Sequence, residues 1–405
     1  MPRRAPLYLA AIFVSLLIPG MLQAGVVPLK MALILKEFNL NSLQFGILSG
    51  GIALLASVLG ASAAWLVPRY GMARVWLSGY VLFAVGLGGI ALLPAGYWCL
   101  LLGIFTAWGM AYLHLGNGLA VNYDPKRGAM YTNLLHGFNA LGKALGPLVA
   151  TIGTGWREPF LTVAGLGALA GLLGWKGWRS FEAQKADPDN STTGDTLQAS
   201  SKEALRKPLF WLCALLFFPI VGMEQVVVFW LPNHLRNSAG LPADDAVFHA
   251  YVAASILLWA ECLGRFGAPI ILRKISPLTL LSVSLICPLA ILVGTEMHIW
   301  TGPLGLIALA VCGLGFAAPW PTFFALACEY LPEHRSLLAI ASGAATSLAF
   351  IAFSALGGYL GHTAGLQWSL RLSPVLALAT LIGVWVARSW SLRRAEGSTS
   401  SPQSL

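Results

Sequence analysis

Apolar stretches long enough to cross a membrane recur along this chain, and they restrict its fold more than any other feature. A helix needs about 20 mostly apolar residues to cross a bilayer. In lipid the backbone can satisfy its hydrogen bonds only within helices or closed barrels. We therefore predict an all-α membrane protein with twelve transmembrane helices in two pseudo-symmetric six-helix bundles. The stretches lie near 7–29, 43–67, 73–94, 97–121, 130–153, 158–178, 208–231, 246–272, 277–297, 302–327, 336–361 and 368–390.

The composition excludes the soluble classes of protein. Only 10% of the 405 residues are charged and the mean hydropathy is +0.73, whereas a soluble domain carries about 25% charged residues. The six cysteines lie in apolar stretches without any C-x-x-C pair, so we expect neither a disulfide framework nor a metal site. The basic start of the chain resembles a signal peptide, but its apolar run continues to Val27. We interpret it as an uncleaved first span.

A polar stretch containing DPDNSTTGDTLQASSKE separates the first six apolar segments from the last six. Such a composition is typical of a flexible linker. We predict an N-terminal six-helix bundle over 1–178, a cytoplasmic linker over 179–207, a C-terminal six-helix bundle over 208–390 and a disordered cytoplasmic tail over 391–405.

The two halves show weak internal repetition. Gly60…Arg69 recurs as Gly264…Arg273, and Phe138…Gly146 recurs as Phe350…Gly358. The offsets of 204 and 212 residues are nearly equal. Together they favour a duplicated six-helix unit, as in many transporters.

The basic residues gather on one side of the predicted spans. With the N-terminus in the cytoplasm, 19 of the 25 lysines and arginines lie at cytoplasmic ends, as the positive-inside rule requires. This bias explains the net charge of +9 without nucleic acid. We expect a multi-pass protein of a bacterial cytoplasmic (inner) membrane, with both termini cytoplasmic and a monomer in the lipid bilayer.

The fifth span carries a polar stripe and a smooth face. At about 100° per residue, Asn133, His136 and Lys143 share one side of the helix. Gly142 and Gly146 lie on a neighbouring side, where another helix can pack closely. Lys143 lies near mid-span, where a charge costs about 2.5–3.5 kcal/mol. We predict that Lys143 contacts substrate or holds Glu224 charged, and a purely structural hydrogen-bonded stripe is the alternative.

Two carboxylates lie within the apolar segments of the second half. Glu224 lies well inside the seventh span, where burial favours a carboxyl group that can bind and release protons. Pairing with Lys143 for packing alone is the other interpretation. Glu261 precedes Arg265 by one turn in the eighth span, which is typical of an i,i+4 ion pair.

Further polar residues complete the candidate set. The tenth span contains Pro319-Trp320-Pro321-Thr322. We expect a broken helix there, because freed carbonyls are tolerated at membrane depth only when they are buried or line a cavity. The remaining candidates for substrate binding or coupling are Gln23, His114, Asn117 and Gln225.

Enzyme motifs do not occur. The sequence has no H-E-x-x-H, P-loop lysine or G-x-S-x-G. We therefore expect neither an enzyme nor an ATP-driven pump, and no cofactor beyond a proton gradient.

Twelve spans, the 6+6 repetition and the central linker resemble the major facilitator superfamily across essentially the whole chain. The loop signature of that family, G-x-x-x-D-R-x-G-R-R, is partly present between the second and third spans. Arg69, Gly71 and Arg74 fit it, whereas Pro68 replaces the acid and Ala64 replaces the first glycine. The resemblance implies a conformational role for these residues and also for Arg265, Gly146 and Pro147.

Local patterns look like the fucose/hexose–proton symporter branch. They are Asn133-x-x-His136 before Gly146-Pro147, Gly222-x-Glu224 before Trp230-Leu, Gly264-Arg265-Phe266, and Pro321-Thr322. Symporters of that branch commonly place acids in spans one and four, where this chain has Gln23 and Asn117. Proton coupling would then fall to Glu224 or Glu261. Gly142-x-x-x-Gly146-Pro147 also resembles an antiporter motif, so uptake and export both stay open.

The resemblance implies a proton-coupled secondary transporter for a small polar, sugar-like solute, working by alternating access. One alternative is a transporter or antiporter of an anionic or amphipathic solute, drawn by Lys143, His136 and His114. The other is a sensor of the same fold that does not transport.

Overall fold

A computed structural model describes residues 5–96, 98–116, 119, 128–182, 203–238, 242–297, 299–300 and 302–399. Within these residues, ten helical segments are long and apolar enough to cross a membrane. Two further helices complete the predicted set. One is the shorter apolar α6 (Trp98–Leu113), and the other is α8 (Gly128–Ala150), which carries the polar stripe. The predicted twelve-helix membrane fold is confirmed.

The first six spans are built from nine described elements, since the first span is interrupted and a short helix follows the second. In chain order they are α1 (Ala5–Gly20), η1 (Met21–Val26), α2 (Val27–Glu37), α3 (Ser42–Gly60), α4 (Ala63–Tyr70), α5 (Met72–Leu92), α6, α8 and α9 (Arg157–Glu182).

The last six spans include two that are each divided into two helices. The elements are α11 (Pro208–Ser238), α12 (Ala243–Ile271), α13 (Pro277–Ile286), α14 (Leu289–Glu296), α15 (Pro303–Ala317), α16 (Pro319–Tyr330), η3 (Pro332–His334), α17 (Arg335–Thr363) and α18 (Leu366–Thr399).

Proline explains both divided spans, because it removes a backbone donor and clashes with the preceding turn. The tenth span breaks at Ala318, directly before Pro319, so the predicted broken helix is confirmed. The ninth span breaks in the same way at Cys287 and Pro288. The first span contains a π-helical stretch, η1, which was not predicted from the sequence.

The smooth face predicted on the fifth span packs closely against the first span. A methyl group added at Gly142 would meet the carbonyl of Leu17, and one added at Gly146 would meet the backbone of Gly25 in η1. Helix α8 therefore approaches α1 and η1 at backbone distance. This contact fixes which side of α8 is left for Lys143 and His136.

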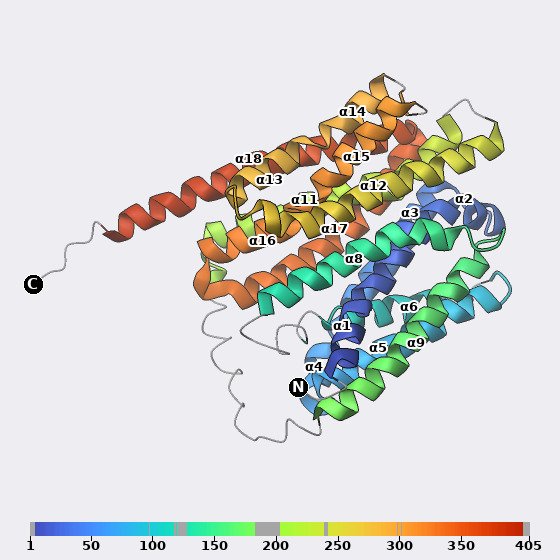
Figure 1. The fold of residues 1–405 in the computed structure, drawn as a ribbon, viewed down its shortest axis with the longest axis horizontal. Helices are drawn as coiled ribbons and strands as arrows, with labels where there is room; N and C mark the ends of the chain where they lie inside the picture. The colour runs from blue at the N-terminus through green and yellow to red at the C-terminus, as the bar shows by residue number, and fades with distance from the viewer. Residues whose placement is uncertain are drawn as a thin grey trace, which may run out of the picture.

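The two groups of spans, coloured blue to green and yellow to red in Figure 1, meet chiefly along two helix pairs. Helix α8 packs against α12, and α3 packs against α17. In the second pair, a methyl group at Gly50 would lie 2.9 Å from the carbonyl oxygen of Ile351. Small residues thus bring the first six spans into direct contact with the last six.

Three described boundaries differ from the predicted ones. Helix α6 ends at Leu113, whereas the predicted fourth span runs to residue 121, and residues 117, 118, 120 and 121 of that span lie outside the described part of the chain. Helix α9 continues to Glu182, past the predicted start of the linker. Helix α18 continues to Thr399 and projects beyond the other helices in Figure 1, whereas the predicted tail begins at residue 391. Its extension includes Leu392, Arg393 and Glu396, which are good helix formers.

Candidate functional site

Four charged side chains from three helices meet inside the molecule. Lys143 comes from α8, Glu224 from α11, and Glu261 and Arg265 from successive turns of α12. We call these four residues the charge cluster. It joins the first six spans, which supply Lys143, to the last six, which supply the other three.

Both cations of the charge cluster contact both carboxylates. Lys143 Nζ donates to Glu224 Oε1 and, at 2.8 Å, to Glu261 Oε1. Arg265 Nη2 lies 2.8 Å from Glu261 Oε1 and 3.5 Å from Glu224 Oε2. The predicted contact between Lys143 and Glu224 is thus present, and so is the predicted i,i+4 pair of Glu261 and Arg265.

The four side chains differ in exposure. Glu261 has no exposed side-chain surface, Arg265 has 8%, Lys143 has 11% and Glu224 has 19%. Two positive and two negative charges cancel, as buried charges require. Within the described residues, Glu261 Oε2 and Arg265 Nε are buried without a hydrogen-bond partner. Glu224 is therefore the carboxylate that an incoming proton or solute can reach most easily.

An aromatic group lies on the same side of α8 as Lys143. The ring of His136 lies 4.8 Å from that of Trp320 in α16, centroid to centroid. Trp320 stacks on Phe324 at 5.5 Å with nearly parallel planes, and it also contacts Phe217 of α11 at 5.7 Å. We call His136, Trp320, Phe324 and Phe217 the aromatic group. Like the charge cluster, it contains residues from both halves of the chain.

Helix geometry relates the two groups. His136 precedes Lys143 by seven residues, which is two turns or about 10 Å along α8. A methyl group at Gly137 would lie 2.8 Å from Cε1 of Phe266, the neighbour of Arg265. Since Gly137 follows His136, Arg265 lies at the end of the charge cluster that is nearer to the aromatic group.

The other predicted site residues have varied positions. Gln23 lies in η1 and Gln225 follows Glu224 in α11, and both are half-buried. Thr322 is buried in α16, and His114 is exposed just after the end of α6. Asn117 lies outside the described residues, as does the side chain of Asn133.

The residues assigned to conformational change surround a sharp turn and a close helix contact. Gly71 has φ +82, which favours glycine, and it ends α4 and begins α5. The guanidinium of Arg69 lies 3.8 Å from the ring centre of Trp65, and that of Arg74 lies 5.6 Å from that of Trp178. These cation–π contacts are made by two arginines that match the family signature, whereas Pro68 occupies the position of its acid.

Gly146 and the buried Pro147 lie in the part of α8 that packs on η1. Arg265, whose conformational role stays a prediction, belongs to the charge cluster. The sequence signal for this position is the spacing of Arg265 from Glu261, which by itself predicts only an isolated i,i+4 pair. The aromatic partners Phe217 and Phe324 were not predicted, since helical period alone does not identify contacts between helices.

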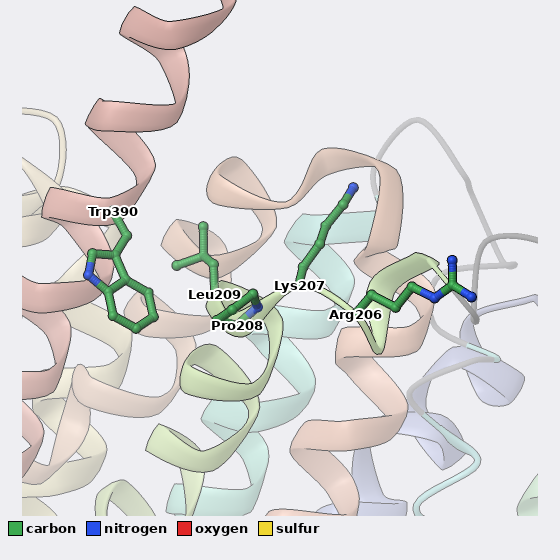
Figure 2. Close-up of a pocket in the computed structure, with 5 residues that line it drawn as sticks. All are labelled: Arg206, Lys207, Pro208, Leu209 and Trp390. Atoms are coloured by element: carbon green, nitrogen blue, oxygen red, sulfur yellow. The ribbon is translucent and has the colours of Figure 1, made fainter.

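A surface depression of about 420 Å³ lies away from both groups, where α11 begins beside α18 (Figure 2). It is lined by Arg206, Lys207, Pro208, Leu209 and Trp390. Lys207 Nζ pairs with Glu203 at 2.6 Å and with Glu333 at 3.3 Å, and it lies 3.0 Å from Nε2 of His334. The ammonium thus already occupies the centre of an acid and histidine group that has the composition of a metal site.

Comparison with known proteins supports the fold. The model of the Major Facilitator Superfamily matches residues 10–344. The chain is 22% identical over 378 residues to the "Cis,cis-muconate transport protein" of Acinetobacter baylyi, covering 86% of this chain and 87% of that protein. It is also 22% identical over 250 residues to the "Nitrite extrusion protein" of Bacillus subtilis, covering 60% of each.

Solved structures with the same fold include two transporters. One is a bacterial homologue of the human lysosomal transporter Spinster, inward-facing and unoccupied, with a TM-score of 0.67, 15% identity and coverage of 96% of this chain and 97% of that one. The other is the E. coli fucose:proton symporter, with a TM-score of 0.63, 16% identity and coverage of 93% and 98%.

Proposed function

Because the chain belongs to the Major Facilitator Superfamily, we propose that it is a secondary active transporter of a small anionic solute and couples transport to protons at Glu224. The observation that supports an anion is the charge cluster, in which two cations from different halves of the chain meet. The names of both relatives refer to anions, which are muconate and nitrite. A sugar-like solute, as the sequence resemblance implied, remains the competing candidate.

Charge balance links the proton to the anion. With both carboxylates ionised, the charge cluster is neutral, and an added anion would leave a buried negative charge. A proton on Glu224 removes one negative charge, so Lys143 and Arg265 then carry a net positive charge. An anion that replaces the Glu224 carboxylate restores neutrality, which burial strongly favours. Proton and anion therefore favour the same bound state.

This arrangement suits alternating access. Lys143 belongs to the first six spans and the three other cluster residues to the last six. The direct ion pair between Lys143 and Glu224 holds the halves together. A bound anion replaces that pair with its own contacts to Lys143 and Arg265. Each ligand shifts the balance between states only by its differential affinity. The coupling therefore depends on Glu224 being neutral when the anion is bound.

Replacing Glu224 tests the coupling. Glu224→Gln mimics the protonated carboxyl group. We expect proteoliposomes with this variant to exchange labelled benzoate down its gradient but to lose accumulation driven by an imposed pH gradient. Glu329→Gln, which changes an exposed carboxylate at the end of α16, is the matched control and should leave both activities unchanged. Accumulation by the Glu224→Gln protein would exclude Glu224 as the coupling site and make Glu261 the next candidate.

Replacing Lys143 tests the charge of the solute. Lys143→Met keeps the length of the side chain and removes its charge. We expect this variant to lose counterflow of carboxylates, since Arg265 alone then faces two acids. Counterflow of neutral sugars but not of acids by the unmodified protein would refute the anion proposal in favour of the sugar alternative. If no solute in either panel shows counterflow, the sensor alternative becomes the better one.

A further inference from the structure

The aromatic group has no task in the coupling scheme above, although it lies next to the charge cluster. Its central residue, Trp320, is held by neighbours on several sides. Phe324 stacks on it, Phe217 contacts it, and its Nε1 lies 3.4 Å from Oγ1 of Thr346. These contacts fix the plane of the indole without help from the first six spans. A rigid aromatic surface of this kind is preorganised for a planar partner.

The ring contact of His136 with Trp320 joins the two halves of the chain. His136 lies on α8, which packs on α1 and η1, whereas Trp320 lies in the first turn of α16. When the halves move apart at this level, the two rings separate and the indole loses a neighbour. A planar group of the solute can replace the imidazole against Trp320.

The position of the charge cluster indicates the chemical nature of the part of the solute that extends beyond its anionic group. Arg265 lies at the end of the charge cluster nearer to the aromatic group, beside Phe266 and Gly137. A carboxylate held by Lys143 and Arg265 would therefore direct the rest of its molecule along α8 towards Trp320. Inorganic anions have no such extension, and a saturated ring does not match a flat surface.

We propose that the solute is a planar, unsaturated or aromatic carboxylate, whose carboxylate pairs with Lys143 and Arg265 and whose conjugated body lies against Trp320. This inference rests on the proposed anion transport and assigns the class of anion. Trp320 is then the residue that determines specificity, while the charge cluster supplies binding to any small anion.

Two probes of equal charge and similar size separate these contributions. Benzoate is planar and aromatic, and cyclohexanecarboxylate is saturated and puckered. Binding of each to the purified full chain is measured by calorimetry in one detergent, at a mildly acidic pH at which both are anions. Since aromatic pairs contribute beyond the area that they bury, we expect benzoate to bind about five- to tenfold more tightly.

Variants at Trp320 assign the preference to the indole. Trp320→Leu should reduce benzoate affinity to that of cyclohexanecarboxylate, while Trp320→Phe should keep part of the preference. Trp259→Leu is the matched control, because Trp259 is 37% exposed on the outer side of α12, and it should leave both affinities unchanged. Thermal unfolding of each variant shows whether it is folded. The ratio of the benzoate and cyclohexanecarboxylate affinities in the unmodified protein is a test that does not depend on any variant.

The outcomes distinguish this inference from the proposed function. Equal affinities for the two probes in the unmodified protein would overturn the inference and leave anion transport intact. So would binding of nitrite or formate without binding of either ring, or an equal loss of both affinities in a folded Trp320→Leu protein. Binding of a neutral sugar with no binding of any acid would overturn the proposed function itself.

Discussion

Glu261 is the residue on which the charge cluster depends most for stability. Its side chain has no exposed surface, and its Oε1 lies 2.8 Å from both Lys143 Nζ and Arg265 Nη2. Glu261→Gln would leave two cations facing one carboxylate. Removing one partner of a buried pair costs about 3–5 kcal/mol, so we expect a clearly lower melting temperature for the purified protein.

A second substitution tests whether the imbalance of charge is the cause of the lower melting temperature. Adding Lys143→Met to Glu261→Gln restores one cation and one carboxylate. The double variant should therefore melt well above the temperature expected from adding the two single effects, because contacting residues are not independent. Purely additive losses would mean that Glu261 stabilises the protein through packing instead.

Single residues also mark the limit of prediction from the sequence. The contact of Lys143 with Glu224 and the pair of Glu261 with Arg265 follow from depth in the membrane and helical spacing. That these two pairs form one charge cluster does not follow from the sequence. Helical spacing shows which face of a helix a residue lies on but not which other helix packs against that face. The aromatic group was missed for the same reason: Trp320 and His136 lie far apart in sequence, on different helices.

Among the helices, α8 is the one whose packing can be tested most directly. Gly142 and Gly146 admit the backbone of the first span, and Gly142→Ala would place a methyl group on the carbonyl of Leu17. Overpacking of a tight contact costs about 1–3 kcal/mol. We expect a lower melting temperature and weaker benzoate binding, because the displaced α8 also carries Lys143 and His136.

Gly165 supplies the matched control for this helix contact. It lies in α9, and a methyl group added there meets nothing within 4 Å. Gly165→Ala should stabilise the protein by up to about 1 kcal/mol through helix propensity. If the two alanine variants melt at the same temperature, the close approach of α8 to α1 is not a constraint on stability.

The sequence predicted which helices form and which of their faces pack closely better than it predicted irregular turns within a helix. Hydropathy located the twelve spans, the prolines located the break at Ala318, and the glycine spacing identified the packing face of α8. The π-helical stretch η1 has no comparable signal, because one extra residue in a turn changes neither composition nor length. It lies where Gly25 meets Gly146, so its geometry depends on a partner from another helix.

Across the whole molecule, the predicted feature with the greatest consequence is alternating access, and the contacts between the halves show how to test it. At the end opposite the linker, the rings of Phe45 in α3 and Phe229 in α11 stack at 5.9 Å. Tyr251 of α12 donates to the carbonyl of Ala150 in α8 at 3.2 Å. The halves therefore meet at this end in the present structure.

Helices α3 and α17 extend from that contact towards the linker end. Gly46 lies against Ser354 and Gly50 against Ile351, so the two helices run antiparallel. Following the same register along both helices places Val58 within one helical turn of Ala341. Val58 is 62% exposed. If the halves rock about a central site, Val58 and Ala341 should approach each other only when the opposite end opens.

Cysteine pairs can report both ends of the molecule. In a background without the six native cysteines, one protein carries Phe45→Cys and Phe229→Cys, and another carries Val58→Cys and Ala341→Cys. A short bifunctional thiol reagent should crosslink each pair in part of the population. In a protein with all four cysteines, the two crosslinks should exclude each other, because each one traps a different state. A single population crosslinked at both ends would contradict rocking of the halves. A shift of the ratio by benzoate would show that the solute biases the same equilibrium.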